Sequence, residues 1–341
     1  MLPPGPPPRT RRSRKTRLAR ALPTLVVAIV LVVLAAGCSS GGPVGQSAAG
    51  PTAAEPTSRT VVDGKGNQVE VPTNPQRALG FYTTDIDILI TLGVPLAPMQ
   101  PIRGDGYTDF PAFFPLDKLT GITTFGNYPE YNFEKVVEAE PDLILNGLGY
   151  DADTVKQLPK IAPTYTVDAF DGKDWRIHFK NTADAFGRSA EYDAWTAGYR
   201  ARVDQAKADI AAAGTADLTV AGLSYFDGAA QISCYGVPCL AFDDLGLPQS
   251  PLQDKQDLKI SAEQLSQLKD VDVVFMGTFP GPNGQQEHDT LMEELNKIPT
   301  WRSLPFVKNN RIHTYDMEMV YGSPSGQTAF LEVVRNALTQ P

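Results

Sequence analysis

The sequence predicts an α/β fold built from two similar lobes and one long helix that braces them. Short apolar strands alternate with helical segments in both halves of the chain, which is typical of parallel sheets covered by helices. The segment at residues 132–147 is echoed at 261–277. Between the two echoes, apolar side chains recur at steps of three or four, which indicates a long helix.

The chain after the first 59 residues opens with a predicted hairpin and a strand–helix–strand unit. The turn-rich Asp63–Asn67 lies between two alternating flanks, as in a β-hairpin. Farther on, Gly93 followed by Pro95 is a typical helix end. We expect, in order, a hairpin of 60–62 and 69–71, a strand at 78–81, a helix at 85–92 and a strand at 96–99.

The two echoed segments share one motif. Each has an N-cap residue, a glutamate two places later and an amphipathic helix, followed by an aspartate and an apolar strand that ends at a glycine. The glutamates are Glu134 and Glu263, and the glycines are Gly147 and Gly277. The shared order indicates two lobes of similar build, with chance similarity between amphipathic segments as the alternative.

Two helices are expected between the lobes. Residues 175–186 form the first, which Gly187 ends, and Ser189 is the expected cap of a second helix at about 190–213. A helix of about 24 residues is roughly 36 Å long. This length is sufficient to brace two lobes that lie side by side.

The charge of the chain is unevenly distributed. Its 341 residues include 30 basic and 39 acidic side chains, yet seven of the basic ones and none of the acidic ones precede Cys38. The chain from Cys38 onward therefore has a net charge of −16. A surface this acidic repels phosphate backbones, so we expect no nucleic-acid partner.

The first 37 residues have the pattern of an export signal. A basic region at Arg9–Arg20 precedes the mostly apolar Ala21–Ala36, which is shorter than the about 20 residues that a membrane span needs. Ala35-Ala36-Gly37-Cys38 then resembles a bacterial lipobox, with Ala35 where leucine is usual. The pattern predicts a lipidated Cys38 that anchors the protein to the cell membrane on its extracytoplasmic face. A plain signal peptide with an incidental cysteine is the alternative.

A flexible tether is expected after Cys38. Residues 39–59 are mostly Ser, Gly, Ala, Pro and Thr, and such a segment cannot bury enough surface to fold. The predicted organisation is a signal peptide at 1–37, a tether at 38–59, an N-terminal lobe at 60–174, connecting helices at 175–213 and a C-terminal lobe at 214–341.

Cys234 and Cys239 lie close together in the segment Cys-Tyr-Gly-Val-Pro-Cys. An exported protein meets an oxidising environment, so we expect a disulfide bond between them. A zinc site would need further ligands, and the neighbouring sequence supplies none.

Several motifs follow one another in an order that is specific as a set. The hairpin is followed by Val-Pro-Thr-Asn-Pro-Gln-Arg at 71–77, and Leu-Gly-Val-Pro stands at 92–95. Phe-Glu-Lys-Val-Val-Glu-Ala-Glu-Pro-Asp-Leu-Ile-Leu follows at 133–145, and Ile-Pro-Thr-Trp-Arg-Ser-Leu-Pro-Phe-Val-Lys-Asn-Asn-Arg-Ile at 298–312. In this order, over about residues 60–338, the chain resembles the substrate-binding lipoproteins of iron-siderophore ABC importers, a group that includes cobalamin binders. The resemblance implies two Rossmann-like α/β lobes, a single bridging helix and a ligand cleft between the lobes.

The resemblance also implies a role for Glu134 and Glu263. Members of the family use one glutamate per lobe, at this place in the motif, to dock on arginines of the membrane permease. A carboxylate in the first turn of a helix is also stabilised by the helix dipole, which is the structural alternative. We expect both residues to serve docking.

Candidate ligand-binding residues follow the predicted strands, because ligands of open α/β sheets bind at the carboxyl ends of strands. Many are aromatic, which suggests a π-rich pocket. Many relatives place an arginine just before the Glu134 motif, where this chain has Asn127-Tyr128. Arg103 is the candidate substitute for that arginine. The departure also favours a hydroxamate or mixed-ligand siderophore over a highly charged catecholate. The candidates are Tyr82, Arg103, Tyr107, Asn127, Tyr128, Tyr225, Phe226, Tyr235, Phe279 and Tyr321.

No sequence pattern predicts a metal site or catalysis. His178, His288 and His313 are scattered, whereas a manganese or zinc site usually gathers imidazoles and carboxylates. The sequence has neither a Gly-x-Ser-x-Gly elbow nor a glycine-rich phosphate loop before a lysine. We therefore expect no enzyme and no cofactor.

These observations together predict a monomeric binding lipoprotein that captures an Fe(III)-siderophore complex and delivers it to the permease of an ABC importer. Haem or cobalamin capture is the alternative within the same class. A ligand-sensing antenna and an exported hydrolase are alternatives of other classes. The antenna would not need both Glu134 and Glu263, and the hydrolase would need a nucleophile beside a base.

Overall fold

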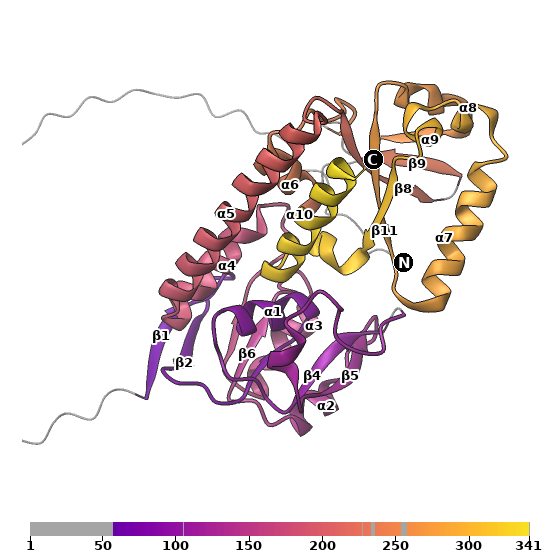
Figure 1. Ribbon diagram of the computed structural model, residues 1–341. Coiled ribbons are helices and arrows are strands. Elements are labelled where there is room, and N and C mark those ends of the chain that lie inside the picture. Colours follow the sequence, from indigo (N-terminus) through magenta and orange to yellow (C-terminus); the bar gives the residue numbers. More distant parts are fainter. Residues whose placement is uncertain (1–56, 105, 227, 233–235, 254–257, 341) are drawn as a thin grey trace, which may run out of the picture. The chain divides into compact units, whose positions relative to one another are not determined.

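The computed structural model describes residues 57–340, except residues 105, 227, 233–235 and 254–257 and the side chains of Phe226 and Pro282 (Figure 1). The strands are β1 Ser58–Val62, β2 Gln68–Pro72, β3 Ala78–Gly80, β4 Met99–Arg103, β5 Thr123–Tyr128, β6 Leu143–Asn146, β7 Thr164–Thr166, β8 Val220–Phe226, β9 Ala229–Ile232, β10 Lys259–Ser261, β11 Val273–Thr278 and β12 Ile312–Asp316.

The helices cover both halves of the described chain. The α-helices are α1 Thr83–Thr91, α2 Phe133–Glu138, α3 Ala152–Gln157, α4 Trp175–Phe186, α5 Ser189–Ala213, α6 Val237–Leu245, α7 Gly281–Leu295, α8 Pro299–Arg302, α9 Pro305–Lys308 and α10 Pro324–Thr339. Short 3-10 helices are η1 Leu116–Leu119, η2 Leu158–Lys160, η3 Ala262–Leu268 and η4 Met317–Tyr321. Among the described residues, no helix combines the length and the apolar character that a membrane crossing requires.

The first lobe contains the predicted hairpin and a parallel sheet. β1 and β2 pair antiparallel, with Thr60 opposite Glu70, which confirms the hairpin although it begins at Ser58. β3, β6 and β7 form a parallel sheet in this order, and β4 pairs parallel with β5. Helix α1 is confirmed, and Gly93 after it has a φ of +64°, the left-handed backbone that favours glycine.

The strand expected at 96–99 is wrong in its position. Leu96 makes only an isolated bridge to Ala78, and the strand β4 begins at Met99. The side chain of Gln100, which is fully buried, fills the gap between β3 and β4. Its Nε2 donates to the carbonyl of Ala78 at 2.9 Å, and its Oε1 accepts from the backbone N–H of Gly80 at 3.0 Å. A side chain thus supplies hydrogen bonds that a backbone ladder would otherwise make.

Replacing Gln100 by alanine is expected to lower the free energy of unfolding by about 2–4 kcal/mol, because the buried N–H of Gly80 loses its acceptor. Urea denaturation followed by circular dichroism measures the change. Gln286→Ala on the exposed face of α7 is the control, and it should change stability by less than about 0.5 kcal/mol. Equal effects of the two substitutions would contradict the bridging role.

The second lobe contains one mixed sheet of five strands in the order β10-β9-β8-β11-β12. β8, β11 and β12 are parallel, and β9 and β10 extend the sheet antiparallel. β8 runs to Phe226 and turns back into β9. The echoed segment also differs between the lobes, since Glu134 lies on an α-helix and Glu263 on the 3-10 helix η3.

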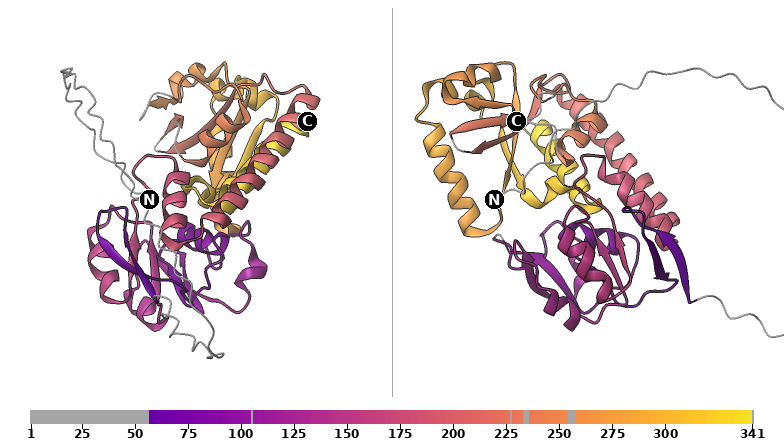
Figure 2. Two further views of the ribbon diagram at one scale, coloured as in Figure 1. Left: turned by 90° about the vertical axis from the view of Figure 1, so that its left-hand side faces the viewer. Right: turned by 180° about the vertical axis from the view of Figure 1, so that it is seen from behind.

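Helices α4 and α5 connect the lobes, as the sequence predicts. α4 ends at Gly187, whose φ is +66°, and α5 ends at Gly214, whose φ is +71°. Ser189 is not the cap of α5, because it is the first helical residue and its hydroxyl donates to Asp184 Oδ1 at 2.8 Å. α5 contacts α1 of the first lobe and α6 and α10 of the second, and Figure 2 shows α5 and α10 side by side.

The two lobes share a hydrophobic core and a buried polar contact. One cluster of buried side chains includes Leu89 and Leu145 from the first lobe and Phe242 and Phe330 from the second. The fully buried Asp87 of α1 accepts hydrogen bonds at the start of α10. Its donors are the backbone N–H of Ser325 at 2.6 Å and the hydroxyl of Ser325 at 2.7 Å. The lobes are therefore fixed against each other through α1, α5 and α10.

Candidate functional site

Arg103 is the centre of a cluster in which side chains of both lobes meet. It is the last residue of β4 and is only 2% exposed. Its Nη1 donates to the hydroxyl of Tyr82 at 2.9 Å and to the hydroxyl of Tyr321 at 3.0 Å, and it lies 3.4 Å from Glu318 Oε1. Tyr82 precedes α1 in the first lobe, whereas Glu318 and Tyr321 belong to η4 in the second. The guanidinium therefore joins the two lobes.

Aromatic rings surround the Arg103 guanidinium. Its central carbon lies 4.8 Å from the ring centroid of Tyr128, 5.4 Å from that of Tyr321 and 5.6 Å from that of Phe279. Phe170 packs edge-on against Tyr321, with ring centroids 5.7 Å apart. Cation–π attraction stabilises a desolvated arginine in such a setting. The cluster thus combines one cation with a π-rich wall, and its role in ligand binding stays a prediction.

Two carboxylates from the second lobe complete the cluster. Glu318 is buried, and burial raises its pKa from 4.5 to about 7, although the charge of Arg103 acts in the opposite direction. Tyr107 donates a hydrogen bond from its hydroxyl to Asp316, which also accepts the backbone N–H of Glu318 at 2.9 Å. Burial raises the pKa of Asp316 as well. The first lobe therefore presents a cation and phenols, and the second lobe presents carboxylates.

The hydroxyls of Tyr82 and Tyr321 are neutral at physiological pH. Burial raises the pKa of Tyr321 to about 12, and burial also raises the pKa of Tyr82. Both hydroxyls accept a hydrogen bond from Arg103. The Tyr82 hydroxyl donates its own proton to Glu318 Oε1 at 3.4 Å, whereas the Tyr321 hydroxyl keeps its proton for a further acceptor. A ligand rich in oxygen acceptors matches this supply of donors.

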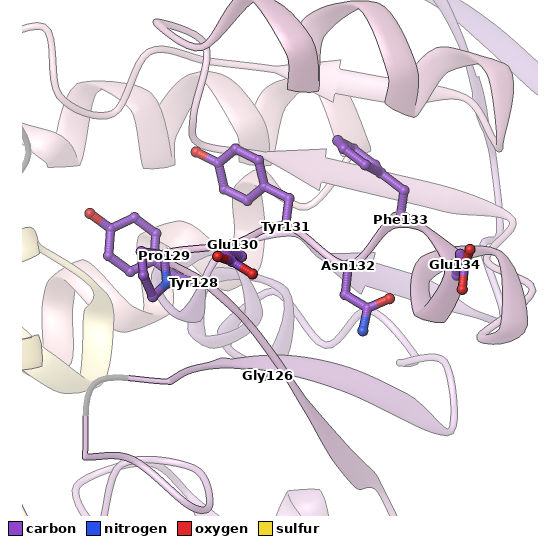
Figure 3. A pocket seen from close by; sticks show the side chains of 8 residues that line it. All are labelled: Gly126, Tyr128, Pro129, Glu130, Tyr131, Asn132, Phe133 and Glu134. Atoms are coloured by element: carbon purple, nitrogen blue, oxygen red, sulfur yellow. The ribbon is translucent and has the colours of Figure 1, made fainter.

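A surface pocket of about 720 Å³ opens beside the cluster (Figure 3). Tyr128 belongs to both, since it lines the pocket and its ring faces Arg103. Figure 3 shows the lining segment running from Tyr128 to Glu134 at the start of α2. The pocket is lined by Gly126, Tyr128, Pro129, Glu130, Tyr131, Asn132, Phe133 and Glu134.

The structure brings six of the ten candidate ligand residues together at this cluster, namely Tyr82, Arg103, Tyr107, Tyr128, Phe279 and Tyr321. Asn127 is used differently: its Nδ2 donates to the carbonyl of Phe81 at 3.0 Å, and its Oδ1 accepts the backbone N–H of Asn132 at 2.8 Å. These contacts brace the backbone. Tyr225 packs against the core of the second lobe.

Two further candidates, the side chain of Phe226 and the whole of Tyr235, lie outside the described part of the chain. The sequence analysis missed Asp316, Glu318 and Phe170. The signal for the two carboxylates was present, because Asp316 ends a parallel strand and Glu318 follows two residues later.

The two predicted docking glutamates are both exposed. Glu134 lies in the first turn of α2, whose N-cap Asn132 accepts the backbone N–H of Lys135 at 3.1 Å. Glu263 lies in the first turn of η3, and a hydrogen bond with Ser261 lowers its pKa. Their role in docking stays a prediction.

The cysteines fall partly outside the described residues. Cys239, in α6, is disulfide-bonded, while Cys234 and Cys38 lie outside the described ranges. The pairing with Cys234 and the lipidation of Cys38 therefore stay predictions.

The histidines are separate from the cluster. His178 Nε2 lies 3.1 Å from Asp171 Oδ1, and burial lowers the pKa of His313. Within residues 57–340, as far as they are described, no group of three or more His, Cys, Asp or Glu side chains is placed to hold a metal ion.

The architecture and the cluster are those of a two-lobed solute-binding protein. A family model described as periplasmic binding protein matches residues 88–319, more than half of the sequence, and the chain belongs to this family.

Proteins of Bacillus subtilis and Staphylococcus aureus are similar to this chain. The probable siderophore-binding lipoprotein YfiY of Bacillus subtilis is 24% identical over 278 residues, which are 79% of this chain and 83% of that protein. The Fe(3+)-citrate-binding protein YfmC of the same species is 24% identical over 311 residues, 89% of this chain and 92% of that protein. The crystal structure of Staphylococcus aureus SirA with staphyloferrin B has a TM-score of 0.66 at 20% identity, over 82% of this chain and 98% of that chain. The structural likeness confirms the two-lobed fold.

Proposed function

We propose that this protein captures a ferric siderophore complex outside the cell membrane and delivers it to an ABC importer. The observation that carries the proposal is the Arg103 cluster, in which donors and aromatic rings of both lobes converge. The names of the similar proteins support it, since they include siderophore and Fe(3+)-citrate binders. The chain is a binding protein in this proposal, and no covalent bond is made or broken.

The cluster is suited to a chelate that presents oxygen atoms and an apolar surface. Arg103 and the hydroxyl of Tyr321 are donors for the oxygen atoms that surround chelated iron, whereas the hydroxyls of Tyr82 and Tyr107 donate to Glu318 and Asp316. Tyr128, Phe279 and Phe170 offer ring faces and edges to the organic part of the chelate. The iron keeps the donor atoms of its siderophore, so the protein recognises the complex as a whole.

Anchoring and delivery complete the proposal. Lipidated Cys38 would hold the protein at the membrane, and residues 39–59 would allow the folded part to reach the permease. Glu134 and Glu263, one exposed carboxylate from each lobe, would dock on permease arginines. The disulfide of Cys239 with Cys234 would hold the loop that carries Tyr235.

Tryptophan fluorescence is expected to report the binding of a ferric siderophore with a Kd of about 1 μM or below. Trp175 is a suitable reporter, because its indole ring packs tightly against Gly322, the residue that follows Tyr321. The mature protein is titrated with ferric hydroxamate, ferric catecholate and ferric citrate complexes, and in parallel with haem and cobalamin. Iron-free siderophores at equal concentration are the control. Saturable binding of haem or cobalamin alone would overturn the proposal in favour of that alternative.

A further inference from the structure

The charge of Arg103 is already balanced by the protein itself. Arg103 Nη1 and Glu318 Oε1 lie 3.4 Å apart, and their side chains are 2% and 1% exposed. Arg103 comes from the end of β4 in the first lobe, and Glu318 comes from η4 in the second, 215 positions later. The ion pair therefore lies across the junction of the two lobes, at the place where the proposed ligand binds.

A second carboxylate lies on the same side. Asp316 accepts the hydroxyl of Tyr107 and the backbone N–H of Glu318, so it stands directly beside the pair. The titratable groups in contact with Arg103 are the phenols of Tyr82 and Tyr128 from the first lobe, and Glu318 and the phenol of Tyr321 from the second. The phenol of Tyr107 and the carboxylate of Asp316 lie one contact farther out, beside Glu318. Among these described groups, one permanent cation faces two carboxyl groups.

We propose that Glu318 sets the charge selectivity of the ligand site. As the built-in counter-ion of Arg103, it makes the site accept ferric chelates with no net charge or a positive charge and disfavour anionic chelates. This inference rests on the proposed function and specifies its ligand class. Hydroxamate groups balance the charge of Fe(III), whereas catecholate and citrate complexes keep a negative charge. The site is thus matched to ferric hydroxamates, including those with a free ammonium group.

The physical reason is the cost of leaving a buried carboxylate without its partner. An anionic chelate that pairs with Arg103 separates this cation from Glu318 and then faces both Glu318 and Asp316 as like charges. A neutral hydroxamate accepts hydrogen bonds from Arg103 without adding negative charge. Its amide N–H groups, or an ammonium group, are donors for the two carboxylates.

The test compares Glu318→Gln with the wild type against three probes: ferrioxamine B as a cationic chelate, ferrichrome as a neutral one and ferric citrate as an anionic one. The wild type should bind the hydroxamates more tightly than ferric citrate. In Glu318→Gln, the ratio of the ferric citrate Kd to the ferrioxamine B Kd should fall about tenfold or more, because the net charge near Arg103 becomes more positive. Glutamine keeps the size of the side chain, which limits disturbance of the fold.

Glu293→Gln is the matched control. Glu293 is an exposed glutamate on α7 of the same lobe, so its substitution changes the net charge of the protein equally but should leave the ratio unchanged within about twofold. A ratio in Glu318→Gln that equals the wild-type ratio, or a wild type that prefers ferric citrate, would overturn the charge-selectivity inference. A wild type that binds none of the three chelates would overturn the inference, and one that binds no ferric catecholate either would overturn the proposed function itself.

The pH dependence of ligand binding provides a second measurement. Protonation of Glu318 removes the same charge as the substitution, and its pKa of about 7 places this event near neutrality. The affinity for ferric citrate should therefore rise, relative to that for ferrichrome, as the pH falls through about 7. The same pH series in Glu318→Gln corrects for protonation of the chelate and of Asp316. Parallel pH profiles in the two proteins would contradict the inference.

Discussion

Replacement of both Glu134 and Glu263 by alanine is expected to abolish the stimulation of importer ATP hydrolysis while ligand affinity stays unchanged. The two carboxylates are exposed, one in each lobe, and neither contacts the Arg103 cluster among the described contacts. Charges at the rim of an interface mainly fix register and guide association. Loss of one carboxylate per lobe therefore removes the orientation of the whole complex on the permease.

The measurement uses the importer reconstituted in lipid, with ligand-loaded binding protein added at increasing concentration. The matched control is Glu138→Ala/Glu293→Ala, which also removes one exposed glutamate from each lobe. The control variant should stimulate ATP hydrolysis like the wild type, and each single variant of Glu134 or Glu263 should fall between the two. Full stimulation by the Glu134→Ala/Glu263→Ala variant would refute the docking role and would favour the alternative function of a ligand-sensing antenna.

Much of the fold could be predicted because local signals and tertiary structure agree. Helix α4 has the predicted bounds, since Gly187 supplies the left-handed residue that ends it. The strand expected at 96–99 failed because the decisive contact is not local: the side chain of Gln100 bonds the backbone of β3, 20 or more positions earlier. A periodicity analysis cannot detect a polar side chain that substitutes for a backbone ladder.

The candidate site could be predicted only in part, because some of its residues have a local sequence signal and others are defined by non-local packing. Aromatic residues at strand ends are visible in the sequence, and Tyr82, Tyr128 and Phe279 do meet at Arg103. Glu318 was missed because a glutamate is usually solvated, even between apolar neighbours such as Met317 and Met319. Only the packing of η4 against β4 shows that this carboxylate is buried and paired with a cation.

Replacement of Arg103 by alanine is expected to lower the free energy of unfolding by about 3–5 kcal/mol at pH 8, because it leaves the buried Glu318 carboxylate without its cation. The variant also loses the donor shared by the hydroxyls of Tyr82 and Tyr321. A double-mutant cycle with Glu318→Gln isolates the pair. Glutamine carries no charge that requires Arg103. The destabilisation of the double variant should therefore be smaller than the sum of the two single destabilisations by about 2–3 kcal/mol.

The pair Arg77–Glu140 is the matched control for this cycle. Its N–O distance is also 3.4 Å, but its side chains are 40% and 80% exposed. Solvent screens such a pair, so the cycle of Arg77→Ala with Glu140→Gln should give a coupling of less than about 1 kcal/mol. Urea denaturation of all six variants and the wild type measures both cycles under the same conditions. Equal coupling in the two cycles would show that burial of the Arg103–Glu318 pair has no energetic consequence.

The pH dependence of the Arg103→Ala effect has a definite sign. In the folded wild type the pKa of Glu318 is raised from 4.5 to about 7, so the folded protein binds more protons than the unfolded chain between these values. The stability that this extra proton binding contributes is fully present below about pH 4.5 and is lost as the pH rises to about 7. Removal of Arg103 raises the pKa of Glu318 further, and the loss then continues above pH 7. The cost of Arg103→Ala should therefore grow between about pH 7 and pH 9, whereas the cost in a Glu318→Gln background should be constant. A cost that decreases with rising pH would mean that Glu318 does not depend on Arg103 for its charge.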